Sequence, residues 1–335
     1  MSRSSLAISV HDPSGVASAR RQATRCAETL HFSETGSGKV AIAVTELATN
    51  LVKHASGGEI IINTDDQHSD VIELLSIDKG NGIANMQTAL RDGYSTAGSA
   101  GTGLGALSRL ATVMDVWSSP ESGTVLLVRI VDDASPSSSP SRLPMIISGI
   151  CVPKGGETQP GDAWSARADG DAVTFCVADG LGHGPAAAEA STRAIGIFLS
   201  SRFDTVETMM QELHDPLRAT RGAAISIARV IAPQHKVEYC GIGNVAATII
   251  DNEKARKAVS HNGIIGHELR KLQLFTYPWS DESLLIMASD GMATSWNLAS
   301  YPGLAQRDPA VIAGVLYRDH CRGTDDATVV VAKMT

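Results

Sequence analysis

One stretch near the middle of the chain, Val173 to Gly184, constrains the fold more than any other. Its sequence, V-T-F-C-V-A-D-G-L-G-H-G, is an almost wholly apolar run that ends abruptly in a carboxylate, Asp179. A short run that is apolar on both faces predicts a buried strand, and Pro185 after a glycine predicts the start of a helix. The glycines between them would let backbone groups approach an ion or a phosphate. On its own, the stretch is equally consistent with a tight turn that carries a solvated aspartate.

The chain divides most clearly at residues 132–144, D-D-A-S-P-S-S-S-P-S-R-L-P, where proline and serine dominate. Because 335 residues are enough for two domains, we expect a first domain over 1–132, a Ser/Pro linker over 133–144 and a second domain over 145–335. The first domain is predicted to hold helices over 15–30, 38–55, 83–91 and 104–112, and strands over 59–63, 71–77, 113–118 and 125–131. This order predicts an α+β two-layer sandwich.

The second domain has many more strand signals than helix signals. Strands are predicted over 145–152, 172–178, 223–231, 236–240, 245–251, 283–288 and 327–332, and helices over 185–200, 205–219 and 308–319. Such a pattern indicates stacked sheets covered by helices, so we expect the α+β class for both domains.

Composition argues against several classes of protein. A net charge of −8 without a basic block argues against nucleic acid as a partner. Because the chain has no apolar run of transmembrane length and no signal-peptide pattern at its N-terminus, we expect no membrane partner and a cytoplasmic location. The five cysteines are an odd number without a CxxC pair, which is typical of buried thiols in a reducing compartment.

The helix expected over 38–55 carries a row of polar side chains. Glu46, Asn50 and His54 recur at i, i+4 and i+8 and therefore lie on one face. Polar groups in a largely apolar helix need partners, and a carboxylate one turn from an amide can hold hydrated Mg²⁺ or a hydroxyl beside it. A solvent-facing stripe is the alternative.

Two glycine motifs follow this helix. Asp78 ends a predicted strand, and Gly80 and Gly82 after it would let a flat ring lie against the backbone while the carboxylate accepts from an exocyclic amine. The run G-T-G-L-G then precedes a predicted helix whose N–H groups could bind phosphates; its glycines are Gly101, Gly103 and Gly105. Each motif alone is a weak signal.

In this order and spacing, the three motifs resemble the N, G1 and G2 boxes of the GHKL ATPase superfamily. The segments E-L-A-T-N-L-V-K-H-A and A-L-R-D-G-Y-S-T-A-G-S-A-G-T-G-L-G-A narrow the resemblance, over about residues 8–131, to the RsbT-like serine kinases of bacterial stress signalling. The resemblance implies a GHKL (Bergerat) fold that binds ATP and Mg²⁺ and performs in-line phosphoryl transfer. Glu46 would be the base for a partner's serine hydroxyl, and Asn50 would coordinate Mg²⁺. Asp78, supported by Thr124, would bind adenine beneath a lid over residues 92–105.

Four aspartates of the second domain stand at the ends of strand-like runs, next to glycines or other small residues: Asp162, Asp179, Asp290 and Asp325. A turn explains any one of them. Together, carboxylates held at strand ends can converge on hard cations such as Mg²⁺ or Mn²⁺. Two such ions, about 3.5–4 Å apart, can activate a water against a phosphate ester.

The second domain resembles the PPM metal-dependent serine/threonine phosphatases, in particular the SpoIIE/RsbX-like branch, over about residues 145–333. The segments D-G-L-G-H-G-P-A-A-A-E-A-S and G-T-D-D-A-T-V-V-V carry the resemblance. It implies an α-β-β-α sandwich with two Mn²⁺ or Mg²⁺ ions. The implied ligands are Asp162, Asp179, the Gly180 carbonyl, Asp290 and Asp325.

Three neighbouring residues qualify this ligand set. Gly161 stands where many larger members of the family have an acidic residue, which would weaken one metal. Asp326 stands where they often have asparagine, so we expect it beside the ligands rather than among them. His183 is interpreted as a local structural group, with a catalytic histidine as the alternative.

The two resemblances together predict a bifunctional switch protein of bacterial stress signalling. The first domain would phosphorylate a serine or threonine of a STAS-domain antagonist or stressosome scaffold protein, and the second would remove such a phosphate. A downstream phosphatase or a sigma-factor regulator is a further possible partner. The alternative is a phosphatase regulated by a non-catalytic, anti-sigma-like module that binds ATP and docks a partner.

Overall fold

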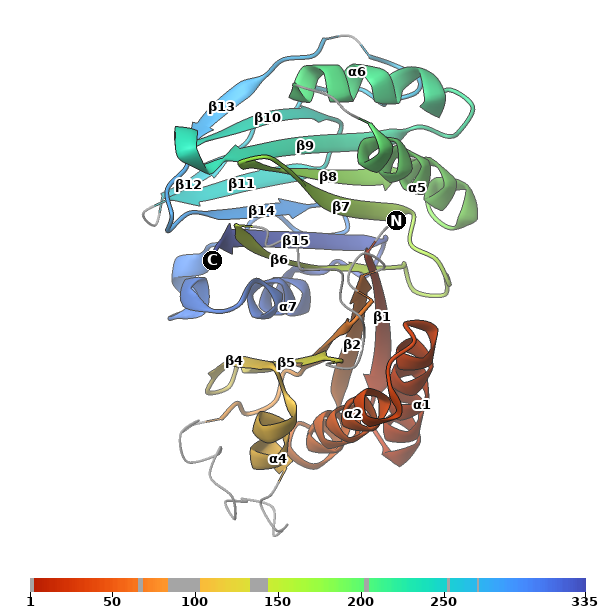
Figure 1. The fold of residues 1–335 in the computed structure, drawn as a ribbon, viewed down its shortest axis with the longest axis vertical. Coiled ribbons are helices and arrows are strands. Elements are labelled where there is room, and N and C mark those ends of the chain that lie inside the picture. Colours follow the sequence, from red (N-terminus) through yellow and green to blue (C-terminus); the bar gives the residue numbers. More distant parts are fainter. Residues whose placement is uncertain are drawn as a thin grey trace. The chain divides into compact units, whose positions relative to one another are not determined.

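The computed structural model describes residues 3–65, 69–83, 103–132, 144–201, 205–251, 254–269 and 271–335. The chain packs as two compact units (Figure 1). The N-terminal unit comprises residues 4–140 and 306–318, and the C-terminal unit comprises residues 1–3, 141–305 and 319–335. The predicted linker falls almost wholly outside the described residues. The predicted helix 308–319 belongs for most of its length to the N-terminal unit, although its sequence lies in the predicted second domain.

The N-terminal unit is built on a five-stranded sheet of order β1-β2-β3-β5-β4, in which β3 pairs antiparallel with β2 and β5, and β5 with β4. Its strands are β1 (Arg3–Val10), β2 (Gly58–Asp65), β3 (Val71–Ile77), β4 (Val113–Ser119) and β5 (Gly123–Val131). Its helices include α1 (Pro13–Thr29), α2 (Glu34–His54) and α4 (Gly103–Leu110). The sequence missed β1, and the helix predicted over 83–91 lies almost wholly outside the described residues.

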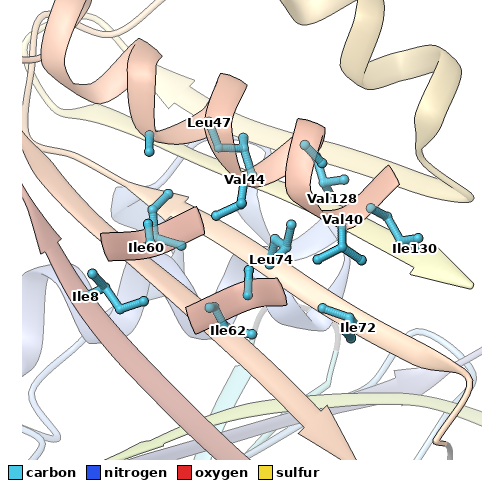
Figure 2. Close-up of a cluster of buried hydrophobic side chains, with 14 of the residues drawn as sticks. Ile8, Val40, Val44, Leu47, Ile60, Ile62, Ile72, Leu74, Val128 and Ile130 are labelled. Atoms are coloured by element: carbon cyan, nitrogen blue, oxygen red, sulfur yellow. The ribbon is translucent and has the colours of Figure 1, made fainter. Parts of the chain in front are cut away.

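One face of this sheet packs against the helices, as Figure 2 shows for α2. Val40, Val44 and Leu47 recur every three or four residues along α2 and are fully buried. They meet side chains from alternate positions of the strands, among them Ile60, Ile62, Ile72, Leu74, Val128 and Ile130. Removing this apolar surface from water is the main stabilising contribution to the unit.

The opposite face of the same sheet is in contact with α7 (Pro309–His320). Side chains alternate along a strand, so Leu75 and Val125 point away from α2. A Cβ added at Gly314 of α7 would lie 2.7 Å from Val125 Cγ1 and 3.9 Å from Leu75 Cδ2, so helix and sheet are in close contact. Arg129 of β5 also pairs with Asp308, just before α7, at 3.2 Å. This second contact contributes to the burial of β3 and β5 on both faces.

The C-terminal unit contains two five-stranded sheets, of order β13-β10-β9-β8-β7 and β12-β11-β14-β15-β6. All their pairings are antiparallel. The strands are β6 (Met145–Val152), β7 (Asp162–Asp169), β8 (Ala172–Gly180), β9 (Ala223–Ile231), β10 (Lys236–Ile242), β11 (Ala246–Asp251), β12 (Lys254–Lys257), β13 (Phe275–Pro278), β14 (Leu284–Ala288) and β15 (Ala327–Met334).

An apolar core lies between these two sheets and includes Trp164 and Phe175 from one and Met287 and Val330 from the other. A second core joins the first sheet to α5 (Pro185–Ser200) and α6 (Val206–Leu217). The predicted α+β class with stacked sheets is therefore confirmed. All five cysteines are free, as expected, and no helix in the described part of the chain is long and apolar enough to span a membrane.

Candidate functional site

Three strands of the first sheet of the C-terminal unit bring two of the predicted aspartates together. The antiparallel register places Asp162, at the start of β7, opposite Asp179, near the end of β8. Asp179 in turn faces Ala224, near the start of β9. Directly opposed residues in such ladders have Cα atoms about 4.5–5.5 Å apart. The two carboxylates therefore lie side by side where β7 begins and β8 ends.

The second sheet contributes the other acidic residues. Asp290 follows the end of β14, and Asp325 and Asp326 immediately precede β15, whose Val329 pairs with the last residue of β14, Ala288. The charges of Asp162, Asp290, Asp325 and Asp326 all act on Asp179, so these four carboxylates lie within electrostatic reach of it. We call this group of five aspartates the acidic edge.

Burial makes the ionised carboxylates of the acidic edge costly. It raises the pKa of Asp162 to about 7, even though Ser289 and Thr328 side chains lower it. Burial, followed by the negative charges of its neighbours, raises the pKa of Asp179 to about 9. Burial and then the charge of Asp325 also raise the pKa of Asp290. Such a group needs positive charge to be fully ionised near neutral pH.

The oxygen atoms of the acidic edge fit a hard cation. In the described part of the chain, three buried oxygens have no hydrogen-bond partner: Asp162 Oδ2, Asp179 Oδ2 and Asp326 Oδ2. Buried carboxylate oxygens without donors are what Mg²⁺ or Mn²⁺ would satisfy. No three acidic, histidine or cysteine side chains among the described residues are grouped to hold an ion by themselves, so backbone carbonyls and water would have to complete the coordination.

The glycine after Asp179 has a physical reason. A side chain at Gly180 would collide with the carbonyl oxygen of Ala187 in α5. Glycine at position 180 therefore allows α5 to pack close to the end of β8. The backbone carbonyl of Gly180 would then be available to an ion at the acidic edge. His183 bonds through Nδ1 to Glu157 Oε1 at 2.8 Å, a contact that suits its interpretation as a local structural group.

Sequence reasoning missed three residues around the acidic edge. Asn244, between β10 and β11, donates through Nδ2 to Asp290 Oδ2 at 2.6 Å. The backbone N–H of Lys154 donates to Asp326 Oδ1 at 2.8 Å. Arg221 precedes β9, and its guanidinium would lie 3.1 Å from a Cβ placed on Gly182. The only hint in the sequence was their place at strand ends, which many solvated residues share.

The N-terminal unit holds a second candidate site, around Asp78 at the end of β3. Asp78 Oδ1 accepts from the backbone N–H of Gly80 at 2.8 Å and of Thr124 at 3.2 Å. Burial raises the pKa of Asp78, and these two bonds lower it. Thr124 Oγ1 lies 3.0 Å from Ser118 Oγ. Asp78 and Thr124 are therefore neighbours, as the sequence predicted.

The other predicted residues of this site lie on α2 and α4. Glu46 and Asn50 are half-buried on α2, whereas His54, at its last position, is exposed. Gly103 opens α4, and Gly105 lies within its first turn. Gly101 and most of the predicted lid, 92–105, lie outside the described residues.

The segment around Asp78 is also in contact with α7, which the sequence did not predict. Arg318 donates to the backbone carbonyl of Asp78 at 3.4 Å, and its guanidinium lies over the ring of Trp117, 5.3 Å from the centroid.

The two predicted domains match two different families of known proteins. Residues 10–130 match the family model of the histidine kinase-like ATPase domain, and residues 169–335 match that of stage II sporulation protein E (SpoIIE). Serine/threonine-protein kinase RsbT of Bacillus subtilis (strain 168) is 29% identical over 110 residues, which cover 32% of this chain and 83% of RsbT. Phosphoserine phosphatase RsbX of the same strain is 26% identical over 140 residues, or 42% of this chain and 70% of RsbX.

A solved structure adds to these similarities. It comes from work on the bacterial stressosome, described as a modular system that has been adapted to control secondary messenger signaling. Its chain is 26% identical to this one with a TM-score of 0.53, and the match covers 56% of this chain and 99% of the other.

Proposed function

The chain joins a histidine kinase-like ATPase domain to a SpoIIE domain of PPM phosphatase type, and from this premise we propose that it is a bifunctional switch protein of bacterial stress signalling. Its C-terminal unit removes phosphate from phosphoserine or phosphothreonine, and its N-terminal unit transfers phosphate from Mg-ATP to serine or threonine. The proposed substrates are STAS-domain antagonist or stressosome scaffold proteins. The acidic edge, with its three unpartnered buried oxygens, is the observation that carries the phosphatase half.

In the phosphatase half, we assign two Mn²⁺ or Mg²⁺ ions to Asp162, Asp179, the Gly180 carbonyl, Asp290 and Asp325. When bound, such ions supply a nucleophilic water and neutralise phosphate charge. Asn244 fixes the Asp290 carboxylate through its 2.6 Å hydrogen bond. Arg221, at the same sheet edge, offers the forked donors that suit a phosphate group.

In the kinase half, Asp78 accepts a hydrogen bond from the exocyclic amine of adenine. Its Oδ1 already bonds to Gly80 and Thr124, which orients the carboxylate for this contact. A side chain at Gly82 would collide with the carbonyl oxygen of Ser119, so glycine there lets the segment after Asp78 pack against β4. The N–H groups at Gly101, Gly103 and Gly105 bind phosphates. Glu46 takes the proton of the partner's hydroxyl, and Asn50 binds the Mg²⁺ of ATP.

A second candidate function changes only the N-terminal unit. There it binds ATP and docks a partner without transferring phosphate, and so regulates the phosphatase. It is favoured by one consideration: opposed activities in one chain would consume ATP unless the state of the partner gates them. In either case we expect partner binding or ATP occupancy to bias one domain.

Transfer of labelled γ-phosphate to a STAS-domain protein separates the two candidates. We expect the wild type to label the protein and Glu46→Ala to abolish labelling while ATP still binds. Glu28→Ala, an exposed glutamate of α1, is the matched control and should label normally. Equally weak labelling by wild type and Glu46→Ala, with ATP bound to both, would support the regulatory module instead.

Loss of an acidic-edge carboxylate tests the phosphatase half. We expect Asp290→Asn to abolish Mn²⁺-dependent release of phosphate from a phosphoserine protein. Asp281→Asn, in an exposed turn, removes the same charge and should have no effect. Retained activity in Asp290→Asn would rule out the metal assignment.

A further inference from the structure

Asp326 is among the most buried charged residues of the C-terminal unit, with only 3% of its surface exposed. Its two carboxylate oxygens have different environments. Oδ1 accepts from the backbone N–H of Lys154 at 2.8 Å. Oδ2 is buried and makes no hydrogen bond of standard geometry with the residues that the structure describes. Burial raises the pKa of Asp326, and the nearby backbone N–H groups of Lys154 and Gly161 lower it.

The position of Asp326 Oδ2 explains why residue 161, just before Asp162, is a glycine. A Cβ built on Gly161 would lie 2.7 Å from Asp326 Oδ2 and 2.8 Å from Ala187 Cβ. No side chain can therefore extend from position 161 without displacing one of these groups. The Asp326 carboxylate, which comes from the second sheet, occupies the space beside Asp162 that a residue at 161 would otherwise enter.

A purely structural role explains only half of this arrangement. The backbone N–H groups of Lys154 and Gly161 tie the loop between β6 and β7 to the start of β15. The single amide oxygen of an asparagine could still accept the Lys154 bond. A carboxylate adds a charge beside Asp162 and Asp179, whose negative charges oppose it. An unpaired buried charge is unfavourable, so a structural role alone favours the amide. The open Oδ2 suits a carboxylate that meets a cation.

We propose that Asp326 is a ligand of one of the metal ions, through Oδ2, in the position that a side chain at Gly161 cannot reach. This assignment rests on the proposed metal-dependent phosphatase and adds a residue to its ligand set. Asp325 remains in the set: its Oδ1 accepts from the backbone N–H of Asp326 at 2.9 Å, which holds the two adjacent carboxylates in a fixed relation.

Asp326→Asn in the full-length protein is the direct test, with Mn²⁺ as the probe. We expect calorimetry to show loss of one Mn²⁺ equivalent. A loss of about 10–100-fold in affinity with both equivalents kept would overturn the assignment, because it is the effect of a group that only orients a ligand. The thermal shift on adding Mn²⁺ should shrink accordingly. Because the amide oxygen can keep the Lys154 bond, the melting temperature without metal should not fall. Asp171→Asn, in the exposed turn between β7 and β8, is the matched control for charge.

Asp326→Glu distinguishes ligation from charge alone, because it keeps the charge and moves the carboxylate by one methylene. A ligand is expected to tolerate neither change, so both variants should bind Mn²⁺ weakly. Wild-type binding by Asp326→Asn, or by Asp326→Glu while Asp326→Asn is impaired, would overturn the ligand assignment alone. A wild type that binds no Mn²⁺ would overturn the proposed phosphatase as well.

Discussion

At the scale of single residues, Asp179 shows how burial and like charge combine in the acidic edge. Its ordinary pKa of 3.8 is raised to about 9, first by burial and then by the charges of neighbours such as Asp162 and Asp290. The folded, metal-free protein therefore binds a proton that the unfolded chain releases. Its contribution to stability is fully present below about pH 4 and is lost as the pH rises toward about 9.

Asp179→Asn removes this pH dependence. Without metal, at pH 8, we expect the variant to melt about 2–8 °C higher than the wild type, because a neutral amide replaces a carboxylate that resists ionisation. Below about pH 4 the difference should vanish. Thermal melts in a chelator between pH 4 and 9 make the measurement. Parallel curves for the two proteins would contradict the role given to Asp179.

Asn244 is expected to act through the carboxylate it holds. Asn244→Ala removes the 2.6 Å hydrogen bond to Asp290, so Asp290 is no longer fixed in orientation. Groups that orient metal ligands typically contribute about 10–100-fold in metal affinity or activity. We expect a loss near the lower end, because Asn244 is exposed.

The measurement is the Mn²⁺ concentration that gives half-maximal phosphatase activity. Asn262→Ala, an exposed asparagine in a neighbouring loop, should leave it unchanged. If Asn244→Ala also leaves it unchanged, the hydrogen bond does not orient a metal ligand.

At the scale of elements, two helical glycines predict opposite effects of the same substitution. Gly314→Ala in α7 puts a methyl group 2.7 Å from Val125 Cγ1, and such overpacking costs about 1–3 kcal/mol. Gly196→Ala in α5 meets nothing within 4 Å and should stabilise by up to about 1 kcal/mol, because alanine favours the helix. Denaturant melts of both variants check the pair. Equal effects would mean that α7 does not pack against β5.

The sequence predicted the elements whose periodicity is strong, such as β8 and α5. It also predicted that aspartates at strand ends would meet, because an antiparallel ladder brings the start of one strand beside the end of the next. β7 was missed because D-A-W-S-A-R-A-D has no clean apolar run. The match between Gly161 and Asp326 could not be predicted, since it depends on which side chain fills a space between two sheets.

At the scale of the whole molecule, neither compact unit is one continuous stretch of the chain. Residues 306–318 belong to the N-terminal unit although they lie far beyond the predicted linker. Arg129 is bonded to Glu73 at 2.6 Å and to Asp308 at 3.2 Å. Domain boundaries read from composition cannot reveal such an arrangement, because composition marks linkers and not the partners of a helix.

The return of α7 to the N-terminal unit predicts how the chain behaves after it is cut. If a protease site is introduced within 133–143 and cleaved, we expect the two fragments to co-elute in size-exclusion chromatography. The contacts of α7 with β3 and β5 would hold them, together with the bond of Arg307 to Asp115 at 3.2 Å. Separation of the two fragments as soon as the chain is cut would contradict this packing.

A double variant tests in the same experiment whether the charged side chains just before α7 help to hold the fragments together. Arg307→Ala combined with Asp308→Ala removes the side-chain contacts of this segment with Asp115 and Arg129 and leaves the bond from the Asp308 backbone N–H to Asp115. Because Arg129 is half-buried and then loses one of its two carboxylates, the cut fragments should separate on dilution more readily than those of the wild type. Asp215→Ala combined with Arg218→Ala removes an exposed pair at the end of α6 and should not change the elution. Equal separation of the two double variants would mean that these contacts do not hold α7 in place.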